Sequence, residues 1–191
     1  MNSIFIYKEI NGEVIITGLK EGVVTTSIVI PETIEGIPVV EIGPEAFRST
    51  SITDIKIGAN IKKIGEKAFY MCNKLRSVTW SHKCDVIPVG CFFGCSNLMQ
   101  FDFSGIKKIE AYAFWRSGLT SVTLSKKTAV DQNCFACCND LEKIEWLSDR
   151  NIEKTIFAEC KNIKEIFISD SVMDIAVDAF VSSPNAEITF V

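Results

Sequence analysis

The sequence predicts a mainly β solenoid, in which short units of similar length stack into a parallel sheet. Three observations predict it: a phenylalanine recurs at near-constant spacing, small and β-branched residues recur at fixed distances before it, and each unit contains a short alternating segment. The recurring residues are Phe47, Phe69, Phe92, Phe114, Phe135, Phe157 and Phe180, with gaps of 22, 23, 22, 21, 22 and 23. Such a period indicates units that bury their apolar edges against their neighbours.

The N-terminal residues 1–27 are expected to form a hairpin-like cap. Residues 4–20 have the pattern of two strands joined at Asn11-Gly12, which is a strong hairpin signal. About seven repeats of 21–23 residues follow over residues 28–191. We expect the whole chain, 1–191, to form a single domain.

One complete unit runs from Ile61 to Trp80. It leads into a turn at Gly65, and the segment EKAFYMC that follows is too short for more than one or two helical turns. The last part, through Val78 to Trp80, alternates like a half-buried strand. We therefore expect a right-handed solenoid with a parallel sheet on its concave face and short helical or 3-10 turns on its convex side.

Two stretches, SIVIPETIEGIPVVEIGPEAF and NIKKIGEKAFYMCNKLRSVTW, resemble leucine-rich repeats of the BspA-like type (leucine-rich repeat type 5). The resemblance covers about residues 28 to 191. The departures from the pattern are Thr50, Ser117, Ser183, Lys127, Asp149 and Ile156. A local bulge is therefore expected in the fifth and sixth units. The resemblance implies a surface-displayed or extracellular protein that binds proteins or host surfaces.

Composition and charge exclude several classes of function. Twenty basic and twenty-four acidic side chains give a net charge of −4, which offers no electrostatic footprint for nucleic acid. The apolar runs are far shorter than the roughly 18 residues that a membrane span needs, so no membrane insertion is expected. Lys8 and Glu9 interrupt any signal-peptide core. The N-terminus thus favours the cytoplasm, whereas the resemblance favours the cell surface, and the location stays open.

The eight cysteines have structural rather than chemical positions in the repeat. Cys72, Cys95, Cys138 and Cys160 share one template position, Cys91 and Cys134 replace the small residue before the phenylalanine, and Cys84 replaces an apolar residue. Only Cys137 has no template role. The C-x-x-C formed by Cys134 and Cys137 lacks a second pair or a histidine at ligand spacing, so we predict no metal and no cofactor. Free thiols are favoured over disulfides.

Nothing in the sequence indicates catalysis. His82, the single histidine, lies in a turn and is expected to be exposed. There is no phosphate-binding loop, no nucleophile motif and no pair of carboxylates in a setting that would shift a pKa. The sequence predicts that the protein is not an enzyme.

Alternation along the predicted strands places two side chains per unit on the outer face of the sheet. These partner-binding candidates are Asp54, Lys56, Ser77, Thr79, Gln100, Asp102, Ser121, Thr123, Lys143, Glu145, Glu165 and Phe167. They favour a non-catalytic protein-binding module, with adhesion as one form of such binding, although Ser and Thr are also ordinary solvent-facing strand residues. A second candidate is the stripe Arg48, Tyr70, Phe93 and Trp115, which is either an exposed anchor or, as we favour, a cover over neighbouring turns.

The last segment, Ala186–Val191, has no polar capping residues behind it. An uncapped solenoid end is an open strand edge. The alternative function is therefore a structural element that assembles end to end through Ala186, Ile188 and Phe190, or that continues in a longer chain. A short, twisted final strand that tolerates water is equally compatible with the pattern.

Overall fold

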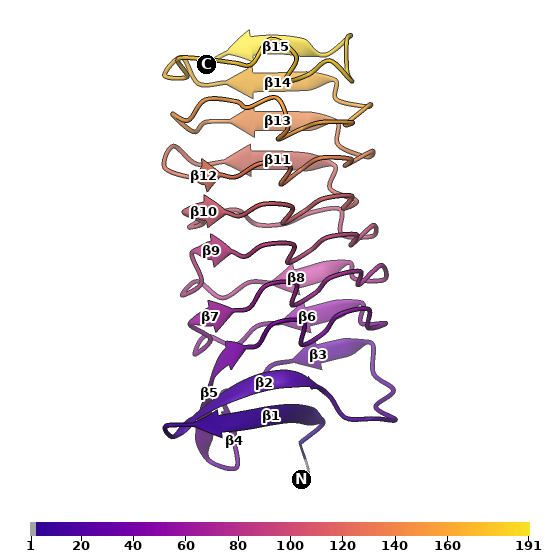
Figure 1. The fold of residues 1–191 in the computed structure, drawn as a ribbon, viewed down its shortest axis with the longest axis vertical. Coiled ribbons are helices and arrows are strands. Elements are labelled where there is room, and N and C mark those ends of the chain that lie inside the picture. The colour runs from indigo at the N-terminus through magenta and orange to yellow at the C-terminus, as the bar shows by residue number, and fades with distance from the viewer. Residues whose placement is uncertain (1–2) are drawn as a thin grey trace.

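The computed structural model describes residues 3–191, which form a continuous stack of strands without a helix (Figure 1). The broad row of strands contains β3 (Ser27–Val29), β6 (Asp54–Lys56), β8 (Ser77–Thr79), β11 (Ser121–Leu124), β13 (Lys143–Trp146), β14 (Glu165–Ile168) and β15 (Glu187–Phe190). The narrow row contains β5 (Ile37–Ile42), β7 (Lys63–Ile64), β9 (Val86–Ile87), β10 (Lys108–Ile109) and β12 (Ala129–Val130). The predicted β solenoid of parallel strands is thus confirmed.

The N-terminal end is closed by a hairpin of β1 (Phe5–Ile10) and β2 (Glu13–Leu19). Asn11 and Gly12 both have positive φ, 52° and 72°, as a two-residue turn of this hand requires. β2 continues the stack by pairing in parallel with β5, and the short β4 (Thr33–Ile34) pairs antiparallel with β5.

The recurring phenylalanines form one column through the core. Six of the seven are at most 1% exposed, and only Phe180, nearest the C-terminal end, is half-buried. Successive ring centroids lie 5.2–5.7 Å apart, with the rings close to parallel. Because each ring buries a large apolar area against the next, the column holds every unit to its neighbour.

The turns around the phenylalanines are hydrogen-bonded turns rather than the helical turns expected. Their N–H groups alternate: the amide of Phe47 donates to the Ala68 carbonyl of the next unit at 2.8 Å, whereas Arg48 donates to Glu45 at 3.0 Å. Glu45 and Ser49 accordingly have φ of 55° and 56°. A helix would need all of these amides for itself. The alternating bonds instead form a ladder along the convex side, which we call the turn ladder.

The shared cysteine position carries a hydrogen-bond donor in every unit. Each of its four thiols donates to the carbonyl of the preceding unit's column phenylalanine, with donor–acceptor distances of 2.9–3.2 Å. Thr50, Ser117 and Ser183 place hydroxyls at the same position, which explains why they replace cysteine there. Burial raises the pKa of the Cys95 thiol well above its usual value, so it remains a neutral donor.

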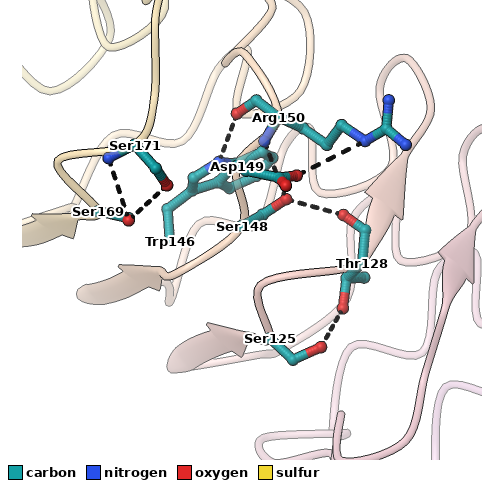
Figure 2. Close-up of polar contacts among 8 residues, drawn as sticks. All are labelled: Ser125, Thr128, Trp146, Ser148, Asp149, Arg150, Ser169 and Ser171. Carbon is teal, nitrogen blue, oxygen red and sulfur yellow. Dashed lines mark hydrogen bonds and ion pairs between the residues drawn. The ribbon is translucent and has the colours of Figure 1, made fainter.

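Buried hydroxyls also tie the loops behind the broad row to the preceding unit. Ser148 donates to the Thr128 carbonyl at 2.9 Å (Figure 2). Thr128 in turn donates to the Ile106 carbonyl, also at 2.9 Å. The sequence pattern placed irregular residues, Lys127 and Asp149, next to these positions. Both are exposed, and the broad row stays regular beside them from β11 to β15. The bulge expected in these units is therefore not found in the broad row.

Candidate functional site

The ladder face is the outer face of the broad row. Strand register aligns its residues: Asp54 lies opposite Ser77, and Ser121 lies opposite Lys143, which lies opposite Glu165. All twelve predicted partner-binding residues are exposed or half-exposed on this face. The same register adds residues that the sequence analysis did not include, namely Ser27, Val29, Glu187 and Thr189. The alternation of side chains along each strand could have identified these residues from the sequence.

In the C-terminal part of the ladder face, the side chains contact one another. The Lys143 Nζ lies 2.9 Å from Glu145 Oε1 and 5.0 Å from the centre of the Phe167 ring. Thr123 donates its hydroxyl to Glu145 Oε2 at 2.9 Å. The bonds from Lys143 and Thr123 lower the pKa of the Glu145 carboxyl, and the same contact with Glu145 raises the pKa of Lys143. The polar groups of these residues thus already find hydrogen-bond or ion-pair partners in one another.

Backbone pairing between strands stops in both rows at one interface, which we call the seam. It lies between the unit 61–80 and the unit 84–103. In the broad row no strand forms at 99–103, between β8 and β11 (Figure 1), and in the narrow row β7 does not pair with β9. Within residues 3–191, the backbone hydrogen bonds that join these two units all belong to the turn ladder. On the far side of 99–103, one bond from Thr120 to the Met99 carbonyl, at 3.0 Å, reaches the next unit.

Large aromatic side chains crowd the broad row at the seam. Phe101 stands where other units have valine or isoleucine, and its ring centroid lies 5.6 Å from that of Trp80 and 5.0 Å from that of Phe103, at steep angles. Tilted rings need more room than the spacing of paired strands, about 4.8 Å. Val78, Trp80 and Phe101 are half-buried, whereas the equivalent Val122 is buried. The sequence contained this signal, but a pattern of apolar positions treats phenylalanine and valine as equal.

Several hollows of the surface adjoin the seam, and three of them share Asp102. The two hollows of 430 and 320 Å³ contain no other carboxylate and no Lys or Arg side chain, and His82 lines the larger of the two. The third includes Arg76. Asp102 Oδ1 accepts the Ser104 N–H at 2.9 Å, and this bond, with a smaller effect of His82, lowers the pKa of the carboxyl. Asp102 is therefore ionised at neutral pH.

A hollow of 610 Å³ lies between β7 and β9, and most of the charged side chains that line it have partners, Glu66 being the exception. Lys63 contacts Glu41 at 3.0 Å, and Asp85 contacts Lys107 at 2.8 Å. In the part of the chain from residue 3 onward, no group of three or more His, Cys, Asp or Glu side chains is arranged to hold a metal ion. Over the same residues, no helix is long and apolar enough to cross a bilayer.

The aromatic stripe on the turns is an ordered stack. The ring centroids of Tyr70, Phe93 and Trp115 follow at 4.5 Å with nearly parallel planes, and the Arg48 guanidinium lies 4.9 Å from the centre of the Tyr70 ring. All three rings are half-buried. Because their faces are turned to one another, the stack agrees with the interpretation that they cover neighbouring turns.

At the C-terminal end, β15 pairs with β14 alone among the described strands. Every residue from Glu187 to Phe190 is exposed, including Ile188 at 47% and Phe190 at 58%. Ala186 is half-buried and packs against the core. The predicted open edge is present in the structure.

Comparison with known proteins identifies the repeat. The model of the BspA type leucine rich repeat region matches six copies, over residues 21–142 and 104–191. A leucine-rich repeat protein from Bacteroides ovatus is 26% identical with a TM-score of 0.79; the match covers 92% of this chain and 52% of that one, so this chain spans about half of its length. None of the curated proteins matches the chain significantly.

Two further solved structures show the same fold. The T. pallidum leucine rich repeat protein is 23% identical with a TM-score of 0.80, over 96% of this chain and 88% of that one. The pneumococcal vaccine antigen PcpA is 17% identical with a TM-score of 0.53, over 100% of this chain and 49% of that one. Since the family model spans residues 21–191 and coincides with the stacked units, the chain belongs to the BspA-type leucine-rich repeat family.

Proposed function

We propose that this protein is a non-catalytic, protein-binding module that engages its partner through the ladder face. Repeat proteins of this family present extended surfaces suited to protein interaction. The observation that carries the proposal is the aligned array of exposed side chains on the ladder face. At the seam, the half-buried side chains of Val78, Trp80 and Phe101 lie beneath this array. Partly exposed aromatic surface beside polar groups is typical of interface hot spots.

Matched double variants test this proposal. Asp102→Ala with Phe167→Ala removes a carboxylate and an aromatic ring from the ladder face, whereas Tyr112→Ala with Glu159→Ala removes the same two kinds of group from exposed turns. Each variant is immobilised and used to capture surface proteins of the source cells. We expect capture to be lost only in the first variant, with circular dichroism and oligomer size unchanged. Equal capture by both variants would contradict the proposal.

The second candidate function is end-to-end assembly through the β15 edge, which the exposed Ile188 and Phe190 favour. Unpaired strand edges are templates for pairing with another chain. Ile188→Lys should then abolish a concentration-dependent increase in mass measured by light scattering, while Lys56→Ala should leave it unchanged. A wild-type protein that stays monomeric at high concentration would exclude this function.

We further propose that residues 1–191 form one domain, with 1–27 as its cap, and that the protein acts at the cell surface or outside the cell on a protein partner rather than on nucleic acid. Family resemblance and the net charge of −4 support these points. Biotinylation of intact source cells with a membrane-impermeant reagent should label the chain. Recovery of unlabelled protein in the cytosolic fraction, beside a labelled surface control, would refute the surface location.

A further inference from the structure

We propose that the seam binds an arginine side chain of the protein partner, with the Asp102 carboxylate as its counter-charge. The inference rests on the proposed function, because it names the chemistry by which the ladder face recognises its partner. Three features of the seam carry it: a carboxylate without a cation, two hollows in which that carboxylate is the dominant charge, and acceptors and aromatic rings that suit a guanidinium.

Like Asp54 and Glu165 on the same face, Asp102 has no cationic partner among residues 3–191, but Asp102 also lines the hollows described above. Asp85 and Asp131 pair with lysines at 2.8 and 3.2 Å, and Asp178 does so at 3.2 Å. Among residues 3–191, none of the ion pairs within 4.0 Å includes Asp102. Its one backbone bond, from Ser104, orients the carboxylate and uses only part of its roughly four acceptor positions.

The hollows beside Asp102 give a side chain room to approach. The 430 Å³ hollow lies between Thr79, Trp80 and His82 on one side and Asp102 on the other. Its volume is within the range of about 300–1,000 Å³ typical of ligand sites. The hollow that contains Arg76 is less suitable for a cation, because that guanidinium would repel it.

The surrounding groups favour a guanidinium over an ammonium. β8 makes no backbone hydrogen bond to residues 99–103, so carbonyl oxygens on that edge remain available as acceptors beside the Thr79 hydroxyl and Asp102. Trp80 and Phe101 supply half-buried rings next to the hollows. A guanidinium offers five donors in one plane and stacks on aromatic rings, whereas an ammonium is a compact point charge.

The test is an NMR titration of the full chain with N-acetyl-arginine amide. We expect chemical-shift changes at the amides of residues 78–80 and 101–104. Asp102→Asn should weaken the binding about tenfold or more, because it removes the charge from a charge-assisted hydrogen bond. Asp54→Asn is the matched control: it makes the same change on the same face but outside the seam, where the Asp54 carboxylate accepts the Thr53 hydroxyl at 2.6 Å. Its affinity should be unchanged.

Two further probes sharpen the result. N-acetyl-citrulline amide, which has nearly the shape of the arginine probe without its charge, and N-acetyl-lysine amide should both bind more weakly. Equal binding of either probe, equal binding by Asp102→Asn, or shifts outside the seam would overturn the inference. If the arginine probe fails while the ladder variants still abolish partner capture, the inference fails and the proposed function stands. If the probe binds at the seam but the ladder-face double variant captures the partner as well as the wild type does, the proposed function fails instead.

Discussion

From β11 to β15 and across the seam, the same template positions carry different side chains. The first region has Val122, Ile144 and Ile166 under its strands, all buried, and four strands pair in register. The seam has Val78 and Phe101 at these positions, both half-buried, and no pairing. The phenylalanine column and the turn ladder run through both regions without interruption.

The difference shows that two systems hold the units together and that only one depends on narrow side chains. The strand ladder is regular where valine or isoleucine occupies the central interior position of each strand, whereas the column places rings face to face and accepts them in every unit. At the seam, strand pairing is therefore absent, and the phenylalanine column continues to hold the neighbouring units together.

The largest contrast is expected between the column and the seam. Phe135→Ala, in the column, should lower the free energy of unfolding by about 4 kcal/mol, and Phe101→Ala, in the seam, by about 2 kcal/mol, since Phe101 is already partly exposed. Chemical denaturation measures both values. Equal losses would mean that the seam is packed as tightly as the column. If Phe135→Ala does not fold, Phe135→Leu provides the comparison with Phe101→Leu.

A closer comparison uses the same residue type at the same template position. Val122→Ala should cost about 2 kcal/mol because Val122 is only 1% exposed, whereas Val78→Ala should cost about 1 kcal/mol or less. Both are again measured by denaturation. A larger loss for Val78→Ala would contradict the looser packing described for the seam.

Phe101→Val replaces the large ring at the seam with a side chain of the size found in the regular units, and so tests whether the bulk of Phe101 prevents strand pairing. We expect the amides of residues 77–80 and 100–103 to exchange more slowly with deuterium, because strand pairing becomes sterically possible there. The net change in stability should stay within about 1 kcal/mol, since lost aromatic burial opposes the new hydrogen bonds. Unchanged exchange would show that another feature keeps the strands apart.

The smallest effect is expected from the ion pair on the regular part of the ladder face. Glu145→Gln should cost about 0.5 kcal/mol at pH 7 and low salt, as exposed pairs typically do. Because the folded-state pKa of Glu145 is lowered, its contribution is present above the unfolded pKa and disappears as the pH falls through the folded value. Denaturation over a series of pH values from 7 downward checks this, with Glu165→Gln, which is in none of the ion pairs of residues 3–191, as a control. A loss that does not shrink as the pH falls would contradict the electrostatic origin.

Much of this architecture could be predicted from the sequence, because it follows from period and alternation. The spacing of Phe47 and its equivalents determines the column, and alternation places residues such as Asp54 on the outer face. The turn ladder could not be predicted, since Glu45 and Ser49 adopt positive φ against their own preference and do so only because bonds between units compensate. The seam could not be predicted either, because it depends on how neighbouring aromatic rings pack against one another in three dimensions. Partner binding by the ladder residues stays a prediction.

The seam also has a mechanical consequence. The turn ladder ties the units together along the convex side, whereas between the unit 61–80 and the unit 84–103 the two rows are joined by single side-chain bonds, such as that from Trp80 Nε1 to the Cys84 carbonyl, instead of paired strands. A rod restrained along one edge bends most readily in the direction that leaves that edge unstretched. The softest motion of this solenoid is therefore a bend about its turns that opens the ladder face at the seam, with two stiffer arms on either side.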